Sequence, residues 1–93
     1  MLLWSHKEPV ERMVTMKIKV KVHDFAQARI KKGFSQRGLA REINKAVSYI
    51  SLLESGNRNP SPQVAKEICE TLEVQFEVIF FIDCGHKSEQ KTA

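Results

Sequence analysis

The sequence predicts a single, mainly α-helical domain of four to five helices with a short strand at its N-terminal end. Ninety-three residues leave room for one hydrophobic core of normal size. A content of 42% hydrophobic and 28% charged residues is typical of a globular chain. Residues 24–72 combine helix-capping residues with apolar spacing of helical period, whereas residues 16–22 alternate between apolar and polar side chains.

The alternating segment 16–22 is expected to form a half-buried strand. Its inner face consists of Met16, Ile18, Val20 and Val22. Its outer face carries three lysines, and edge lysines protect a strand against unwanted pairing. Residues 1–15 show neither helical nor strand period, so we expect a disordered leader there.

The first helix is expected to start at Asp24, whose carboxylate can accept a hydrogen bond from a first-turn amide. Phe25, Ala28 and Ile30 are expected to face the core. Gly33 is expected to end this helix, because glycine adopts the left-handed conformation of a helix C-terminus without strain.

A second helix is expected from its capping residue, Ser35, to about Ile43. Leu39 and Ala40 lie on its apolar side together with Ile43. Gly38 inside this helix costs about 1 kcal/mol relative to alanine. The residues leave open whether a close helix contact compensates for that cost or the glycine is merely tolerated.

The next turn is marked by Asn44, since asparagine is the non-glycine residue that best tolerates the left-handed conformation. A third helix is expected over about residues 46–54, with Ile50 and Leu53 at core spacing. Residues 55–60 consist of turn-forming residue types and predict a loop.

A fourth helix is expected to begin after its capping residue, Ser61, with Pro62 at the first helical position. Its apolar stripe comprises Val64, Ala65, Ile68, Cys69 and Leu72. This spacing predicts one helix face packed on the core.

The C-terminal end is densely apolar from residue 74 to residue 82, so periodicity alone cannot separate helix from strand. We expect a helical turn near residues 76–80 that passes into a short strand. That strand is the obvious partner for residues 17–22, because a lone strand leaves its backbone groups unpaired. The folded domain is then residues 16–83, and residues 84–93 are expected to form a flexible tail.

The net charge of +4 is unevenly distributed. Residues 17–45 carry nine cations against two carboxylates, a net +7, whereas residues 46–93 carry four against seven, a net −3. This asymmetry favours a surface for a polyanion, either nucleic acid or an anionic membrane. A solvated lysine-rich surface is the alternative.

The cysteines, the histidines and the N-terminal apolar run limit the cellular compartment and the chemistry that we expect of this protein. Cys69 and Cys84 do not describe a disulfide scaffold, and the apolar run at residues 1–4 is too short for a secretory or membrane-spanning segment, so we expect a cytoplasmic protein. Three scattered histidines, with no nucleophile or paired-carboxylate arrangement, predict neither an enzyme nor a cofactor. Cys69, Cys84 and His86 lack the paired spacing of zinc ligands, so no metal is expected.

The second and third helices, joined by a short turn, form a helix-turn-helix arrangement. The match extends to single residues at fixed spacing: RIKKGFSQ at 29–36, LA at 39–40, VSYIS at 47–51 and LESGNRNPS at 53–61. This pattern resembles the Cro and phage-repressor family, also called the XRE family, over about residues 24–80. The resemblance implies a lambda-repressor-like fold and a transcriptional regulator that binds double-stranded DNA sequence-specifically, of the phage- or mobile-element-type repressor kind. It also implies a bacterial or phage-infected cell and association with the nucleoid.

By this resemblance, residues 46–54 are the recognition helix, which enters the major groove by its N-terminal end. The expected base-reading residues are Lys45, Ala46, Val47, Ser48, Ser51 and Leu52. Val47 is suited to a thymine methyl, the serines to a base edge or a phosphate, and Lys45 to a phosphate or a guanine. Plain helix surface is the alternative for each. Val47, Ser48 and Leu52 stand at the base-reading positions, with no Gln, Asn or Arg for a bidentate contact, so specificity would rest on thymine methyls, water and DNA shape.

The resemblance also implies phosphate contacts around that helix. The expected residues are Ser35, Gln36, Arg37, Tyr49, Asn57, Arg58 and Asn59. Helix capping is the other use of Ser35, a partial core position is the favoured use of the Tyr49 ring, and a plain flexible loop is the alternative for residues 56–59. The cations best placed to flank the DNA backbone are Lys31, Lys32, Arg37, Arg41 and Lys45.

Two matched positions are assigned to structure. Arg29 and Glu54 stand where the family has a partly buried ion pair between the first and third helices, so losing either should leave the other charge uncompensated. Asn44 departs from the family, which usually has glycine in this turn.

One helix-turn-helix reads only half of a DNA site, and the family usually binds as a dimer. Residues Phe76 to Ile82, together with the Lys17 to Val22 strand, are the candidate homodimer surface, and intramolecular core is the competing assignment. The alternative function is an antitoxin-like or adaptor protein whose phenylalanine-rich end binds a protein partner, with DNA binding secondary. Neither a membrane nor a small-molecule substrate is expected as a partner.

Overall fold

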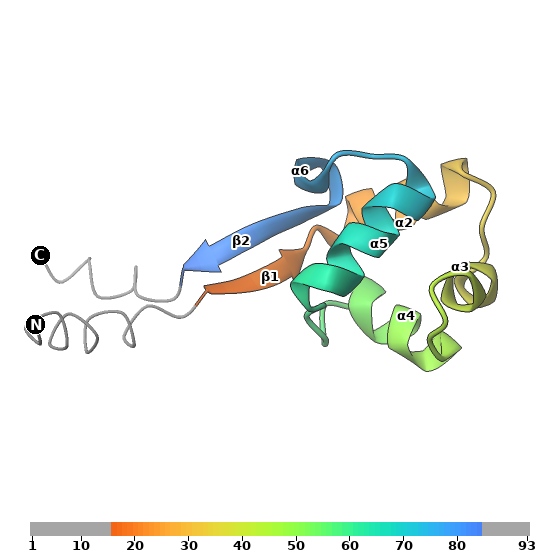
Figure 1. Ribbon diagram of the computed structural model, residues 1–93, viewed down its shortest axis with the longest axis horizontal. Helices are drawn as coiled ribbons and strands as arrows, with labels where there is room; N and C mark the ends of the chain where they lie inside the picture. Colours follow the sequence, from red (N-terminus) through yellow and green to blue (C-terminus); the bar gives the residue numbers. More distant parts are fainter. Residues whose placement is uncertain (1–15, 85–93) are drawn as a thin grey trace, which may run out of the picture.

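The computed structural model describes residues 16–84, which form a helical body with a two-stranded ribbon (Figure 1). The elements in chain order are β1 (Met16–Val20), α2 (Val22–Lys31), α3 (Gln36–Glu42), α4 (Val47–Glu54), α5 (Pro62–Leu72), α6 (Phe76–Ile79) and β2 (Phe80–Cys84). The predicted fold class, mainly helical with a terminal strand pair, is confirmed. The leader and tail expected for residues 1–15 and 85–93 lie outside the described residues.

The ribbon joins the two ends of the described chain. β1 and β2 pair antiparallel, with Met16 opposite Cys84 and Val20 opposite Phe80. This confirms the helical turn followed by a strand at the C-terminal end, and its pairing with the first strand. Cys84, expected in the tail, is the last residue of β2. The ribbon extends from the helical body on the side away from α3 (Figure 1).

The start of α2 differs from the sequence expectation. The helix begins at Val22, with Lys21 at the N-cap position, so Asp24 lies inside the first turn and is not the cap. The strand expected over residues 16–22 ends at Val20, and the Lys21 amide donates one further bond, at 2.9 Å, to the Ile79 carbonyl before the helix begins. Asp24 still places a carboxylate near the positive end of the helix dipole.

One core assignment in α2 is wrong. Phe25 is fully buried and Ala28 packs against the core, but Ile30 is 62% exposed. Two residues correspond to about 200° around an α-helix, so Ile30 points away from the face that Ala28 presents to the core.

The turns use left-handed residues where the sequence predicts them. Gly33 has φ +88°, and Asn44, at the turn between α3 and α4, has φ +59°. After α3, the Asn44 amide donates to the Arg41 carbonyl at 3.2 Å, and the Lys45 amide donates to the Ala40 carbonyl at 2.8 Å. These two bonds satisfy the last carbonyls of α3 and let α4 begin at once.

Both predicted serine caps are confirmed. Ser35 accepts a hydrogen bond from the Gly38 amide at 2.9 Å, and Ser61 accepts one from the Val64 amide at 3.2 Å. A Cβ added at Gly38 would lie 3.2 Å from the Ser35 Oγ and 3.6 Å from a ring carbon of Phe34. The space at Gly38 is therefore limited by its own helix cap and not by a crossing helix.

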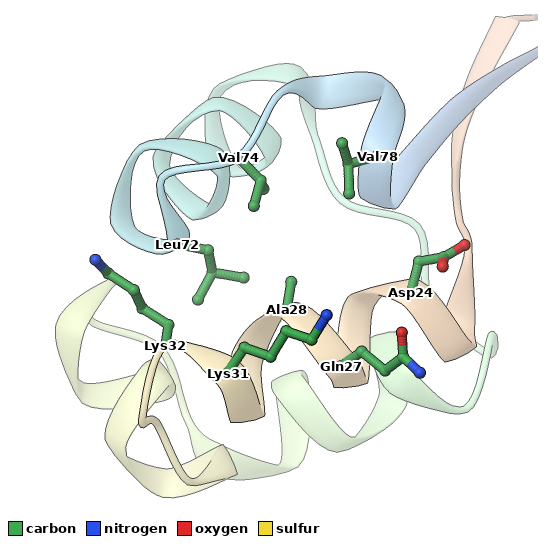
Figure 2. A pocket seen from close by; sticks show the side chains of 8 residues that line it. All are labelled: Asp24, Gln27, Ala28, Lys31, Lys32, Leu72, Val74 and Val78. Atoms are coloured by element: carbon green, nitrogen blue, oxygen red, sulfur yellow. The ribbon is translucent and has the colours of Figure 1, made fainter.

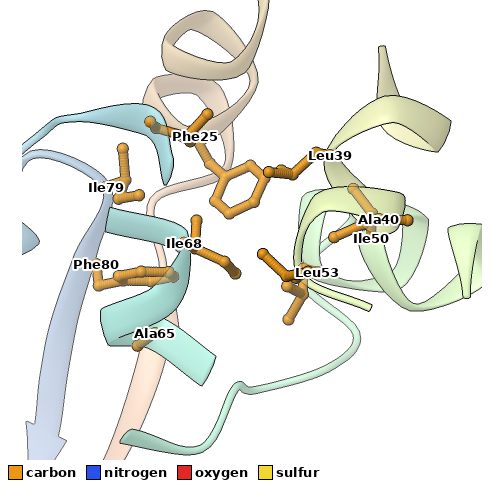
Figure 3. Close-up of a cluster of buried hydrophobic side chains, with 11 residues drawn as sticks. Phe25, Leu39, Ala40, Ile50, Leu53, Ala65, Ile68, Ile79 and Phe80 are labelled. Atoms are coloured by element: carbon orange, nitrogen blue, oxygen red, sulfur yellow. The ribbon is translucent and has the colours of Figure 1, made fainter. Parts of the chain in front are cut away.

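The core lies between the helices and the base of the ribbon (Figure 3). Phe25 and Phe80 meet edge to face, with ring centroids 6.0 Å apart. The buried apolar residues are Phe25, Leu39, Ala40, Ile43, Ile50, Leu53, Ala65, Ile68, Leu72, Ile79 and Phe80. Apart from Ile30, the core positions expected for the four helices are buried or packed against the core.

Candidate nucleic-acid interface

The inner face of α4 is fixed and its outer face is free. Ile50 and Leu53 are fully buried, whereas Ser48 and Ser51 are exposed and Leu52 is 38% exposed. These three outward residues lie at positions expected to read bases. A helix that is anchored on one face and presents small side chains on the other can approach a DNA groove closely.

The residues at the start of α4 divide into two groups. Lys45 and Ala46 are exposed. Val47 is half-buried and packs against the core, so much of its side chain is withdrawn from a thymine methyl. Ala46 occupies the N-cap position without a side chain that could accept a hydrogen bond. The first-turn amides of α4 therefore lack the cap that Ser35 provides to α3.

An ion-pair network connects α4 to the two helices before it. Nε and Nη2 of Arg29 donate to the two carboxylate oxygens of Glu54, and the Nη2–Oε1 distance is 3.1 Å. Arg29 Nη1 donates to the Phe34 carbonyl at 2.9 Å, and Gln36 Nε2 donates to Glu54 Oε1 at 3.0 Å. The Arg29 and Glu54 side chains are only 12% and 11% exposed. The network therefore links α2, the start of α3 and α4.

Two expected phosphate ligands already have partners within the protein. Gln36 is half-buried and bound to Glu54, and the Ser35 hydroxyl is occupied as the cap of α3. The second N–H of the Gln36 amide and the O–H of Ser35 are donors that these bonds do not use. Arg37, the second residue of α3, is exposed.

Tyr49 brings together two cations from opposite ends of α4. The Lys45 Nζ and the Arg58 Cζ each lie 5.4 Å from the centre of its ring. The ring is half-buried and packs against the core. Burial raises the pKa of the Tyr49 hydroxyl, and the nearby Arg58 charge acts in the opposite direction. The Lys45 and Tyr49 pairing was missed by the sequence prediction, and the spacing rule for helix side chains does not predict it because Lys45 precedes Ala46, the N-cap residue of α4.

The loop after α4 is held by hydrogen bonds. The Asn57 amide donates to the Leu52 carbonyl at 3.0 Å, and the Asn57 side chain donates to Ser55 Oγ at 3.0 Å. Gly56 adopts φ +81°. Arg58 and Asn59 are exposed beside α4. The first part of the expected phosphate-binding loop is thus held by its own hydrogen bonds.

Lys31 and Lys32 line a different surface, a hollow of about 360 Å³ between α2 and the α5–α6 connection (Figure 2). Apolar side chains, including Leu72 and Val78, form its floor, and no residue of α4 lines it. Lys32 also pairs with Glu73 at 3.0 Å. The assignment of these two lysines to the DNA backbone stays a prediction.

Neither a metal-binding cluster nor a membrane-spanning helix is found among residues 16–84. No group of three or more His, Cys, Asp or Glu side chains in that range could hold a metal ion. No helix in the same range is long and apolar enough to cross a membrane.

The arrangement of α2 to α6 defines a helix-turn-helix protein, with α3 and α4 as the two helices of the motif. A family model described as "Helix-turn-helix" matches residues 25–79. This chain belongs to the XRE-type helix-turn-helix family of DNA-binding transcriptional regulators. The family assignment made from the residue pattern is confirmed.

Similar proteins include regulators of this class. The "Uncharacterized HTH-type transcriptional regulator YqaF" of Bacillus subtilis (strain 168) is 35% identical over 64 residues, which cover 69% of this chain and 83% of that relative. The restriction-modification controller protein C.AhdI from Aeromonas hydrophila is 27% identical, with a TM-score of 0.56 over 60% of this chain and 81% of its own. The wild-type controller C.Esp1396I is 31% identical, with a TM-score of 0.52 over 58% and 71%.

Proposed function

We propose that this chain is a sequence-specific regulator of the phage- or mobile-element repressor type that inserts α4 into the major groove of double-stranded DNA in the cytoplasm. The observation that carries the proposal is the division of α4 into a buried and an exposed face. Ile50 and Leu53 anchor it, Ser48 and Ser51 face outward, and exposed cations stand at both ends. Similarity to restriction-modification controllers supports a regulatory role.

Base reading is assigned to the exposed part of the predicted set. Ser48 and Ser51 can exchange hydrogen bonds with base edges, and Leu52 offers an apolar surface to a thymine methyl. Ala46 is small enough to let the backbone approach. Val47 contributes less, because it is partly used in the core. Such a face favours readout through water and DNA shape.

Phosphate binding is assigned to the rim of this face. Arg37, Arg58 and Asn59 are exposed cationic or amide side chains next to α4. Ser35, Gln36, Tyr49 and Asn57 would add hydrogen bonds from groups that also have structural roles. Contacts of this kind give affinity and register but no base preference.

A homodimer is proposed through the exposed part of the ribbon. Of the expected surface, Ile79 and Phe80 are fully buried in the core, but Phe81 and Ile82 are 45% and 54% exposed. Met16 on β1 is 64% exposed. A groove of about 420 Å³ between the ribbon and α5 is lined by Met16 and Ile82, whereas Phe81 is not part of its lining and lies on the other face of the strand. A second copy covering this surface would bring two copies of α4 to one DNA site.

The test is selection of bound sequences from random duplex DNA with the purified protein. We expect a palindrome whose half-sites are about 10 base pairs apart, as two recognition helices one DNA turn apart require. Affinity should fall steeply with salt, because phosphate contacts release counterions. Absence of duplex binding at low salt would refute the proposal. A monomer that instead binds a different protein through the ribbon would favour the antitoxin-like or adaptor function.

A further inference from the structure

Tyr49 occupies an unusual position between two cations that are far apart in sequence. Lys45 lies just before α4 and Arg58 lies in the loop after it, yet both charged groups are 5.4 Å from the centre of the Tyr49 ring. Both cationic residues are exposed, whereas the ring is half-buried against the core. The ring is therefore the fixed part of the cluster, and the two cations are the parts that solvent or a ligand can reach.

We propose that the Tyr49 ring is a positioning platform that holds Lys45 and Arg58 as a pair for the DNA backbone. Lys45 is then a phosphate ligand and not a reader of guanine. The inference rests on the proposed DNA-binding function and refines how that function is achieved.

The first argument concerns order. A cation is attracted to the electron-rich face of an aromatic ring. Free Lys and Arg side chains have many rotamers, and fixing them on binding costs conformational entropy. A ring that restrains both side chains before DNA arrives reduces that cost, so each phosphate contact becomes more favourable.

The second argument concerns charge. The two cationic groups cannot be further apart than twice their distance of 5.4 Å from the shared ring centre. Neither takes part in the ion pairs formed among residues 16–84. Two neighbouring positive charges without a carboxylate repel each other, and a phosphate close to both would relieve that repulsion. The cluster is therefore suited to an anion.

The third argument concerns Tyr49 itself. The Tyr49 hydroxyl is neutral at physiological pH, as that of an ordinary tyrosine is, and desolvation raises its pKa further. A neutral ring attracts the cations through its face and does not neutralise them, so both positive charges remain available to DNA.

The experiment compares Tyr49→Leu, Tyr49→Phe, Lys45→Ala and Arg58→Ala with the wild-type chain. Binding is measured on the duplex selected from random DNA and on an unrelated duplex, between about 50 and 200 mM salt. Tyr49→Leu should lower affinity for both duplexes about tenfold, from the loss of two cation–ring interactions. It should also reduce the salt slope by about one to two, since each lost phosphate contact changes it by about 0.9. Tyr49→Phe keeps the ring, so it should keep the wild-type salt slope and lose no more affinity than the single hydrogen bond of the hydroxyl, about fivefold.

A double-mutant cycle tests the platform directly. Lys45→Ala should weaken binding to both duplexes equally and lower the salt slope by about one. In a Tyr49→Leu background the same substitution should cost clearly less, because the lysine is no longer positioned. Lys31→Ala is the matched control: it removes one positive charge at the hollow, where no residue of α4 lies, and its cost should be the same in both backgrounds.

Folding is monitored separately because Tyr49 also packs against the core. Thermal unfolding of each variant shows whether the binding assay is made on folded protein. In the wild-type chain without DNA, NMR should show the terminal side-chain CH₂ protons of Lys45 and Arg58 shifted upfield by the ring. Ordinary shifts for both side chains would overturn the platform whatever the variants do.

The outcomes separate the two proposals. If the wild-type chain binds no duplex, both are wrong. If it binds, but Tyr49→Leu leaves affinity and salt slope unchanged or the cycle is additive, only the platform is wrong. If Tyr49→Phe loses as much as Tyr49→Leu, the hydroxyl and not the ring is responsible. If Lys45→Ala alters base preference, Lys45 reads a base and the phosphate assignment fails.

Discussion

Arg29 of α2 and Glu54 of α4 form a two-pronged ion pair that is almost withdrawn from solvent, with side chains 12% and 11% exposed. The guanidinium also donates to the Phe34 carbonyl at the turn into α3, and the carboxylate accepts from Gln36. The last residue of α4 is thus tied both to α2 and to the first residue of α3. The main effect of the pair is therefore to fix the orientation of α4 relative to α2 and α3.

Removing one member of the pair should be strongly destabilising. Glu54→Gln leaves the Arg29 charge uncompensated, and Arg29→Ala leaves the Glu54 carboxylate and the Phe34 carbonyl without their donors, so for each we expect a loss of about 3 kcal/mol in the free energy of unfolding. Chemical denaturation measures it. The control is Lys66→Ala, which breaks an exposed pair with Glu70 at 3.9 Å and should cost less than about 0.5 kcal/mol. Equal losses in the two experiments would show that burial of the Arg29–Glu54 pair does not increase its contribution to the free energy of unfolding.

Asn44 and Glu73 are the two non-glycine residues with positive φ in the described range, at +59° and +57°. Asn44→Ala should destabilise the protein by about 1 kcal/mol, because the Cβ is strained in this conformation in both residues but only the short polar side chain of asparagine can offset the strain by interacting with the local backbone. Glu73→Gly should stabilise it by up to about 1 kcal/mol, since its pair with Lys32 is largely exposed. Thermal unfolding checks both, and a stabilising Asn44→Ala would contradict the assignment of strain to this turn.

Local rules explain why so much of the fold was predictable. Ser35, Ser61, Gly33 and Asn44 each act within a few residues of their own position, and all four behave as expected. Asp24 shows where such rules stop. The Lys21 amide is bound by the carbonyl of Ile79, from the other end of the chain, and this distant contact sets the start of α2.

The sequence predicted which positions of α4 face outward, but not how deeply each side chain of the candidate site is buried. Spacing along α4 identified Ser48 and Ser51 as outward, but it could not show that Val47, at the first turn, packs partly on the core. For a related reason, the sequence alone could not decide whether residues 76–82 belong to the core or to an exposed surface. One continuous apolar run serves both the core, at Phe80, and the exposed ribbon, at Ile82.

Val47 and Ser48 should therefore respond differently to truncation. Val47→Ala is expected to cost about 1 kcal/mol of stability, as the loss of partly buried methyl groups does, with a smaller effect on DNA affinity. Ser48→Ala should leave stability within about 0.5 kcal/mol and lower affinity for the selected duplex about fivefold, through one lost hydrogen bond. Parallel unfolding and binding measurements make the comparison. The reverse pattern would move base reading from Ser48 to Val47.

Gly38 and the Ser35 hydroxyl should be energetically coupled. A Cβ at position 38 would meet Ser35 Oγ at 3.2 Å, which opposes the helix-propensity gain of alanine. We expect Gly38→Ala alone to be neutral within about 0.5 kcal/mol. In a Ser35→Ala background the clash is absent, and the same change should stabilise by about 0.5–1 kcal/mol. A double-mutant cycle of unfolding free energies that is additive would exclude this coupling.

The ribbon surface can be tested without touching the core. Ile82 is 54% exposed and lies opposite Ile18 in the ribbon, whereas the preceding apolar residue on the same face, Phe80, is fully buried. Ile82→Lys should leave the stability of the monomer within about 0.5 kcal/mol but place a charge in the proposed homodimer surface. We expect sedimentation equilibrium to show a dimer for the wild-type chain and a monomer for the variant. The variant should also bind a palindromic duplex more weakly than the wild-type chain does. Phe80→Ala is the contrasting variant, because losing a buried aromatic ring should cost about 3–5 kcal/mol of stability. A dimer that persists unchanged in Ile82→Lys would place the interface elsewhere on the molecule.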